Sequence, residues 1–409
     1  MSVFLDECRT GWRNLLAATI GMAFGVACYT PVTSLFLRAL GVEFGWSKTV
    51  AVGALVAMPI TAISLPIAGR LIDRFGVRVT TMFSIAASTI SLLILSQLNG
   101  SITQYYGAVI ALNVLGCATG PIGYTVLVAA QFRGSRGTAL ACAQFGIAFV
   151  AVLLPPILGA IMARYGWREA YLLLCGTTLL GGIAAQLLMQ PPVRTPGKQS
   201  PSSADGFTVR AALGSTTFWV LGLSIGAIAI GANGFVTQFQ SVLIEHGSSA
   251  TSANWLLSLL ALSVMLSRLG VGGLLDLANP STAAAAVIAV AAIGAILLAA
   301  TTGQAMTVAA IILIGISLGA ELNILSFFCA RYFGLRHYSA IYGLLAMFFY
   351  FGIAIGGLSF GIIRDKTGGY ELALYLAAGL LVVAALLLLG MDRIAARRGQ
   401  SQDAPPLPA

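Results

Sequence analysis

The sequence contains very little charge. Asp, Glu, Lys and Arg make up 9% of its 409 residues, against about 25% in a typical soluble protein. Histidine occurs only at His246 and His337, and no two cysteines form a CxxC pair. These shortages exclude a soluble enzyme, and they leave no metal or nucleophile cluster for an intramembrane enzyme. We therefore expect no catalysis, no metal site and no cofactor.

Hydrophobic residues are abundant and are spread along almost the whole chain. They make up 58% of the sequence, and the mean hydropathy is +0.93. A helix needs about 20 apolar residues to cross a bilayer, and spans must pair their own backbone groups. The sequence therefore predicts an all-α membrane protein with twelve transmembrane helices at 14–40, 48–70, 79–98, 104–131, 137–163, 168–190, 216–244, 251–274, 282–302, 305–331, 338–363 and 370–391.

A polar segment divides these spans into two halves of six. Residues 191–215 are rich in Pro and Ser and predict a solvated linker. The predicted domains are a half at 1–190, the linker, a second half at 216–392 and a disordered tail at 393–409.

The net charge of +9 is explained by membrane topology and does not indicate nucleic-acid binding. Of the 22 Lys and Arg residues, Arg268 lies within a span, and six lie on one predicted side, at positions 38, 48, 164, 168, 364 and 366. The other fifteen lie on the opposite side, with the linker. Positive charge favours the cytoplasm, so we expect both termini there.

The two halves share a weak internal repeat. Gly69 and Asp73 after the second span recur as Gly272 and Asp276 after the eighth, 203 residues later. Duplicated membrane transporters bind their substrate near the bilayer midplane, between repeats that rock against each other.

The loop between the second and third spans carries a motif. Gly69, Asp73, Arg74, Gly76 and Arg78 lie in the sequence GRLIDRFGVR, which resembles the signature loop of the major facilitator superfamily. This resemblance implies the major facilitator fold. It also implies that the motif is a conformational gate, with an interaction of Asp73 that forms and breaks during transport.

Three further segments carry a narrower resemblance. FGWSKT, RYGWREAY and GAELNILSFFCARYFGLRHYSAIYG are similar to the bacterial branch that contains the oxalate/formate antiporter and relatives of the monocarboxylate transporters. That resemblance implies a monomeric carrier of small organic anions in a bacterial inner membrane. It implies that protons or a second anion drive transport.

Two ionisable residues lie inside apolar runs, Arg268 and Glu321. A charge at the centre of a membrane helix costs about 2.5 to 3.5 kcal/mol, so each requires a function or a partner. Burial disfavours the charged form of Glu321 and a nearby cation favours it, and such a balance suits a proton carrier. Alternatively, Glu321 is a structural partner of Arg268.

The resemblance assigns Arg268 to the substrate carboxylate. In the similar carriers an arginine of the eighth span, eight residues before an aspartate such as Asp276, binds the substrate. The alternative is an arginine that extends to the membrane surface. Neither second substrate cation of those carriers is present. Phe349 occupies the position of a lysine in the eleventh span of the oxalate carrier, and Val32 occupies the position of a lysine in the first span of the animal monocarboxylate carriers. One arginine suits a monocarboxylate better than a dicarboxylate.

Other polar residues of the spans are candidates for the substrate pocket. Tyr29 and Tyr124 rank first, because the first and fourth spans line the cavity in this fold, and Phe349 offers an aromatic wall. The remaining candidates are Asn113, Gln144, Asn233, Gln238 and Asn323.

The sequence as a whole predicts proton-coupled uptake of a monocarboxylate by alternating access. Uptake of a larger anion, such as a siderophore or an aromatic acid, and anion exchange are the alternatives.

Overall fold

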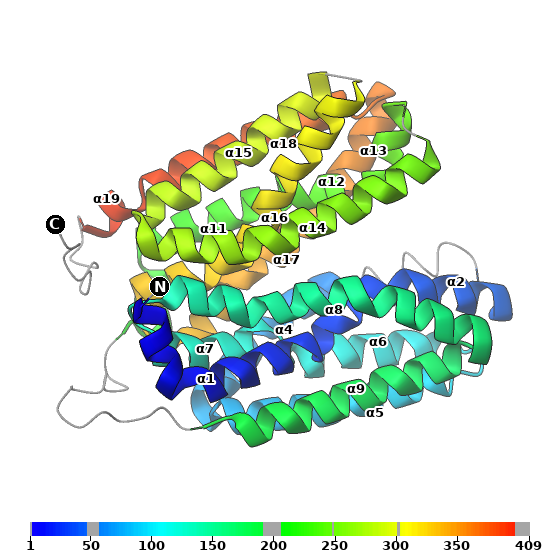
Figure 1. Cartoon of the computed structure of the whole chain (residues 1–409), viewed down its shortest axis with the longest axis horizontal. Coiled ribbons are helices and arrows are strands. Elements are labelled where there is room, and N and C mark those ends of the chain that lie inside the picture. Colours follow the sequence, from blue (N-terminus) through cyan, green and yellow to red (C-terminus); the bar gives the residue numbers. More distant parts are fainter. Residues whose placement is uncertain (1, 47–56, 191–205, 248, 301–302, 397–409) are drawn as a thin grey trace. The chain divides into compact units, whose positions relative to one another are not determined.

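The computed structural model describes residues 2–46, 57–190, 206–247, 249–300 and 303–396. Helices dominate this part of the chain, and one isolated bridge pairs Gly206 with Gly334. The chain forms two compact units, 1–200 and 201–409 (Figure 1). Part of the predicted linker, 191–205, lies outside the described residues, as does 397–409 of the predicted tail.

The first unit is a bundle of long helices joined by short turns. Its helices are α1 (Ser2–Ala23), η1 (Val26–Cys28), η2 (Thr30–Val32), α2 (Thr33–Phe44), α4 (Ala57–Phe75), α5 (Val77–Ser96), α6 (Ile102–Gly116), η4 (Cys117–Thr119), α7 (Pro121–Gln131), α8 (Arg136–Tyr165) and α9 (Trp167–Leu188).

The second unit repeats this architecture. Its helices are α10 (Val209–Leu213), α11 (Thr216–Ile228), η5 (Ala229–Asn233), α12 (Gly234–Thr237), α13 (Phe239–Glu245), α14 (Ala250–Leu277), α15 (Pro280–Ala300), α16 (Gln304–Phe333), α17 (Tyr338–Thr367), α18 (Glu371–Leu389) and α19 (Met391–Ala396). Helix α10 lies within the range predicted as linker, and α19 includes residues 393–396 of the range predicted as disordered tail.

Ten helices of the described chain are long and apolar enough to cross a membrane. An eleventh span results if the bent pair 3–23 and 26–44 is counted as one. The predicted span 48–70 lies partly outside the described residues, and α4 contains its described part. The all-α membrane architecture predicted from hydropathy is confirmed.

The first span is broken, whereas the sequence predicts one continuous helix over 14–40. Its two parts meet at an angle of 43°, and the second part begins with two short 3-10 turns. Pro31 lacks a backbone N–H and so cannot continue the helical ladder. Gly25 lies at the break, where there is no room for a side chain: an added Cβ would lie 2.5 Å from the Thr119 carbonyl oxygen.

Side-chain hydroxyls cap the N-termini of several helices. Ser101, Ser215 and Ser249 each accept a hydrogen bond from a backbone N–H in the first turn of α6, α11 and α14. Such caps satisfy N–H groups that have no partner within the helix. Thus the sequence defines where these spans begin.

Ion pairs tie the first span of each unit to a neighbour. In the first unit, Arg168 donates to Glu43 at 2.9 Å, and the Trp167 indole also donates to Glu43. In the second unit, Arg364 lies 3.6 Å from Glu245. Glu43 and Glu245 lie near the ends of α2 and α13, so equivalent spans are anchored at the corresponding end.

Candidate functional site

Helices α14 and α16 approach each other closely because glycines face the contact. An added Cβ at Gly319 would lie 2.5 Å from the Val264 carbonyl oxygen, and one at Gly315 would lie 2.6 Å from Ser263. Small residues at such a contact let membrane helices pack backbone to backbone. The contact therefore sets the position of Arg268, which lies one turn beyond Val264.

Arg268 is buried, with 9% of its surface exposed. Its backbone carbonyl accepts a hydrogen bond of 2.8 Å from the Asn323 side chain on α16. Its guanidinium Nε and Nη1 atoms are buried without a hydrogen-bond partner among the described residues. Unpaired buried donors are rare because each loses its bonds to water. The backbone of Arg268 is therefore held in place by a hydrogen bond, while two nitrogen atoms of its guanidinium have no hydrogen-bond partner in the described chain.

Glu321 is also buried, with 5% exposed, and it lies on the same helix as Asn323. Its Oε2 accepts a hydrogen bond of 3.2 Å from Asn233 Nδ2. Within the described chain no ion pair shorter than 4.0 Å joins Glu321 to Arg268. Each is nevertheless the main charge acting on the other. The structure thus brings together the two charges that the sequence singles out, close enough to interact but not in direct contact.

A π-helical turn positions Asn233. Residues Ala229–Asn233 interrupt the α-helical ladder between α11 and α12. A π turn adds a residue to the helix and rotates the next turns about the helix axis, and such turns are frequent at functional sites. Gly234, the next residue, packs against the Phe360 ring, which lies 2.7 Å from where its Cβ would be. The sequence identifies Asn233 as a polar candidate, but it predicts neither the π turn nor the bond to Glu321.

Helix α17 contributes aromatic residues to this unit. Tyr342 is 2% exposed, and its side chain lies close enough to Arg268 for the two groups to interact electrostatically. Phe349, at the position of the missing second cation, is buried and packs edge-on against Tyr350, with ring centroids 5.3 Å apart. Tyr342 therefore joins the site, although the sequence does not single it out.

Tyr29 belongs to the first unit, at the break of the first span. It is 3% exposed, and its hydroxyl lies 3.4 Å from that of Tyr171. The ring of Phe36 stacks on Tyr171 with centroids 3.8 Å apart. Tyr29 is thus part of an aromatic core that also packs around the broken helix.

Tyr124 and Gln144 are the other buried polar candidates of this unit. Tyr124 on α7 is fully buried and packs against Gly21 of α1. Its hydroxyl has no hydrogen-bond partner within the described chain, and neither do the amide atoms of the fully buried Gln144 on α8. Both side chains have unused hydrogen-bonding capacity.

The signature motif spans the junction of α4 and α5. The sequence predicts a loop over 71–78, whereas α4 continues to Phe75 and α5 begins at Val77. The single residue between them is Gly76, whose φ of +82° favours glycine. Because the motif is largely helical, its side chains have defined directions.

Within the motif, Arg78 and Arg74 are exposed and Gly69 is buried. The Arg78 guanidinium donates to the Gln186 carbonyl at 3.3 Å, and the Gln186 amide donates to the Arg78 carbonyl at 3.2 Å. These reciprocal bonds tie the start of α5 to the end of α9. Arg74 lies over the Phe75 ring, 5.3 Å from its centroid.

Comparison with known proteins places these features in a family. The family model described as Major Facilitator Superfamily matches residues 15–357. The "Uncharacterized transporter YycB" of Bacillus subtilis (strain 168) is 23% identical over 395 residues, which cover 95% of this chain and 94% of that protein. Human "Monocarboxylate transporter 1" is 24% identical over 181 residues, covering 44% of this chain and 36% of the transporter.

Solved structures share the fold. The Escherichia coli fucose:proton symporter FucP superposes with a TM-score of 0.73 at 15% identity, over 95% of this chain and 98% of that one. The human organic anion transporter MFSD10 (TETRAN) gives a TM-score of 0.73 at 14% identity, over 93% and 99%. These matches confirm the predicted fold class.

Proposed function

This chain belongs to the Major Facilitator Superfamily, and we propose that it imports a monocarboxylate together with a proton. It is a multi-pass membrane protein and a secondary transporter. In this proposal Arg268 binds the carboxylate, Glu321 carries the proton, and alternating access moves both across the membrane. We place the protein in the inner membrane of a bacterium with both termini in the cytoplasm, as the distribution of Lys and Arg favours.

The observation that carries the proposal is the unpaired guanidinium of Arg268. A buried cation normally has its hydrogen bonds satisfied, yet two of its nitrogen atoms have no partner in the described chain. A carboxylate is the complementary ligand, because its oxygens accept several charge-assisted hydrogen bonds from the planar guanidinium. The partial similarity to proteins named monocarboxylate transporters supports the same ligand class.

Charge balance explains why a proton would accompany the anion. Before either ligand binds, Arg268 is a cation and Glu321 is an anion, so the net charge of the site is zero. A bound monocarboxylate alone makes it negative, and a bound proton alone makes it positive. Net charge within a bilayer is costly. The rocking transition is therefore easiest when both ligands are bound or neither is, and this condition couples them.

Uptake into proteoliposomes tests the proposal. We expect saturable uptake of a small monocarboxylate that an inward proton gradient accelerates. Arg268→Gln removes the charged donors, which contribute about 1.5 to 3 kcal/mol, so binding should weaken at least ten-fold. Arg9→Gln, which changes an exposed arginine in α1, serves as the control because that side chain is 84% exposed.

Three outcomes would contradict the proposal. Uptake that is equal in the Arg268→Gln and Arg9→Gln variants would remove Arg268 from the binding site. Uptake of larger aromatic acids in preference to small ones would show that the substrate is not a small monocarboxylate. Uptake driven by an internal anion but not by a proton gradient would identify the protein as an exchanger.

A further inference from the structure

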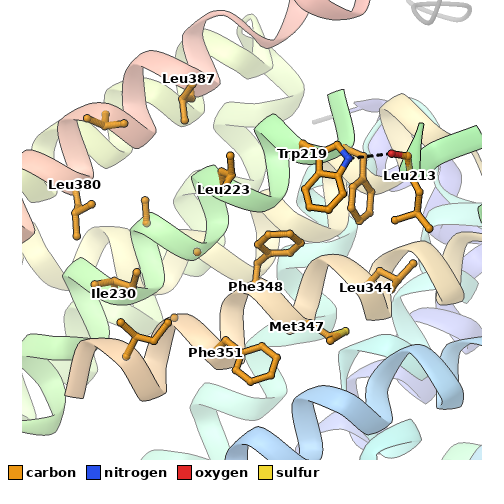
Figure 2. Close-up of a pocket in the computed structure, with 16 residues that line it drawn as sticks. Leu213, Trp219, Leu223, Ile230, Leu344, Met347, Phe348, Phe351, Leu380 and Leu387 are labelled. Carbon is orange, nitrogen blue, oxygen red and sulfur yellow. Dashed lines mark hydrogen bonds between the residues drawn. The ribbon is translucent and has the colours of Figure 1, made fainter. Parts of the chain in front are cut away.

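Helices α11, α17 and α18 leave an apolar groove on the second unit (Figure 2). Its volume is about 660 Å³, which lies within the range typical of small-molecule sites. Leu213 and Trp219 line one end, and Ile230 and Leu380 line the other. The groove therefore extends from the start of α11 to the π turn that ends it.

The walls of the groove face outward. Leu223 is 55% exposed and Ile355 and Val383 are each 50% exposed, and all three lie within membrane-spanning helices. The Trp219 indole N–H donates to the Leu213 carbonyl at 2.9 Å, so it is not free to bind a ligand (Figure 2). Exposed apolar walls at membrane depth contact lipid hydrocarbon, and the part of any occupant that enters this groove must be apolar.

Positive charge lies next to one end of the groove. Arg210 precedes the lining residue Leu213 by three positions and therefore shares its face of α10. Arg393 lies on α19, which packs against α11. Both arginines are exposed, and neither forms an ion pair within the part of the chain that the structure covers. The tryptophan at this end is typical of the bilayer interface.

We propose that this groove binds one acyl chain of an anionic phospholipid, whose phosphate group lies over Arg210 and Arg393. An acyl chain gains little by moving from lipid into an equally apolar groove. The groove therefore determines where the lipid lies, and the two arginines determine which headgroup is preferred. This site is separate from the Arg268 site and does not depend on what is transported.

Native mass spectrometry of the purified full-length protein tests the site. The protein is equilibrated with equal amounts of phosphatidylglycerol and phosphatidylcholine, and the retained lipids are counted. We expect one phosphatidylglycerol to be retained in preference to phosphatidylcholine. Each arginine near a membrane surface contributes about a five-fold preference for anionic lipid. The double variant Arg210→Gln/Arg393→Gln should therefore reduce the preference by about five-fold or more.

A second variant tests the groove itself. Ala227 lines the groove on α11, and Ala227→Phe would fill it. We expect this variant to lose the retained lipid whatever its headgroup. Leu376→Phe is the matched control, because Leu376 is 52% exposed on α18 but does not line the groove. The melting temperature of each variant shows whether it is folded.

Specific results would overturn the proposal. Equal retention of the two lipids by the unaltered protein would remove the role of the arginines. A preference for phosphatidylglycerol that remains in the double variant Arg210→Gln/Arg393→Gln would also show that these arginines do not select the headgroup. If Ala227→Phe changes the oligomeric state but not the lipid count, the groove is a contact between copies of the chain.

Discussion

Arg268 and Glu321 are single residues whose separation matters as much as their presence. No ion pair within 4.0 Å joins these two described residues, although each is the main charge on the other. A direct ion pair would occupy the guanidinium and compete with a ligand. The separation leaves donors of Arg268 available, and Asn233 gives Glu321 a neutral partner instead.

Replacing Glu321 with glutamine should separate exchange from accumulation. The variant site is neutral when the anion is bound and positive when it is not, so only the loaded form crosses readily. We expect counterflow exchange to persist, while gradient-driven accumulation and its dependence on pH are lost. Both are measured as uptake into proteoliposomes. Glu371→Gln, at the exposed start of α18, is the control, and equal loss of both activities would make Glu321 structural.

Asn323 is a positioning residue for Arg268, and its effect can be measured by substitution. Asn323→Leu removes the donor to the Arg268 carbonyl, which contributes about 0.5 to 1.5 kcal/mol. We expect the KM for substrate to rise about two- to ten-fold, with the maximal rate nearly unchanged. Ser267→Ala removes a comparable bond of 2.6 Å to the Ile316 carbonyl across the same helix pair. A rise in KM of the same size in both variants would contradict a specific role for Asn323.

Single residues can be identified as site candidates from the sequence when their position in a membrane helix is energetically costly. A charge within an apolar run has a large energetic cost, so Arg268 and Glu321 can be recognised without a structure. Tyr342 and the contact between Asn233 and Glu321 could not be recognised in this way. Uncharged polar residues are common in membrane helices, and their partners depend on how separate helices pack.

At the scale of elements, the close contact of α14 and α16 should be sensitive to a single methyl group. Gly319→Ala would place a Cβ 2.5 Å from a backbone carbonyl that cannot move aside. We expect it to destabilise the fold by about 1 to 3 kcal/mol, as overpacking does, and to lower the melting temperature. Gly270→Ala on α14 is the matched control, because its Cβ would meet no atom within 4 Å. Equal melting temperatures for the two variants would show that the helices can separate at no cost.

The helix pattern can be predicted from hydropathy, but breaks within the helices cannot. The interruptions of α11 at the π turn and of the first span near Pro31 leave the apolar composition unchanged. Hydropathy therefore predicts a continuous span in each case. The motif around Gly76 shows the opposite effect, because charged residues suggest a loop where the helices continue to within one residue of each other.

At the scale of the whole molecule, the balanced charge of the site predicts electroneutral transport. In the proposed mechanism one anion and one proton move together, so no net charge would cross the membrane in a cycle. We expect the uptake rate to be unaffected by a potassium diffusion potential imposed with valinomycin, at constant pH on both sides. A pH gradient without a potential should accelerate uptake in the same vesicles. Uptake that responds to the potential alone would show that the stoichiometry is different.

The bond between Asn323 and the backbone at Arg268 has a consequence for efficiency. Because Glu321 lies on the same helix as Asn323, and Asn323 is hydrogen-bonded to α14, Arg268 and Glu321 belong to a single rigid unit. A rigid unit cannot open one of them to the cell interior while the other still faces outside. In the proposed mechanism, the anion and the proton would therefore be released into the same compartment, while the cost of net charge within the bilayer opposes movement of either ligand alone.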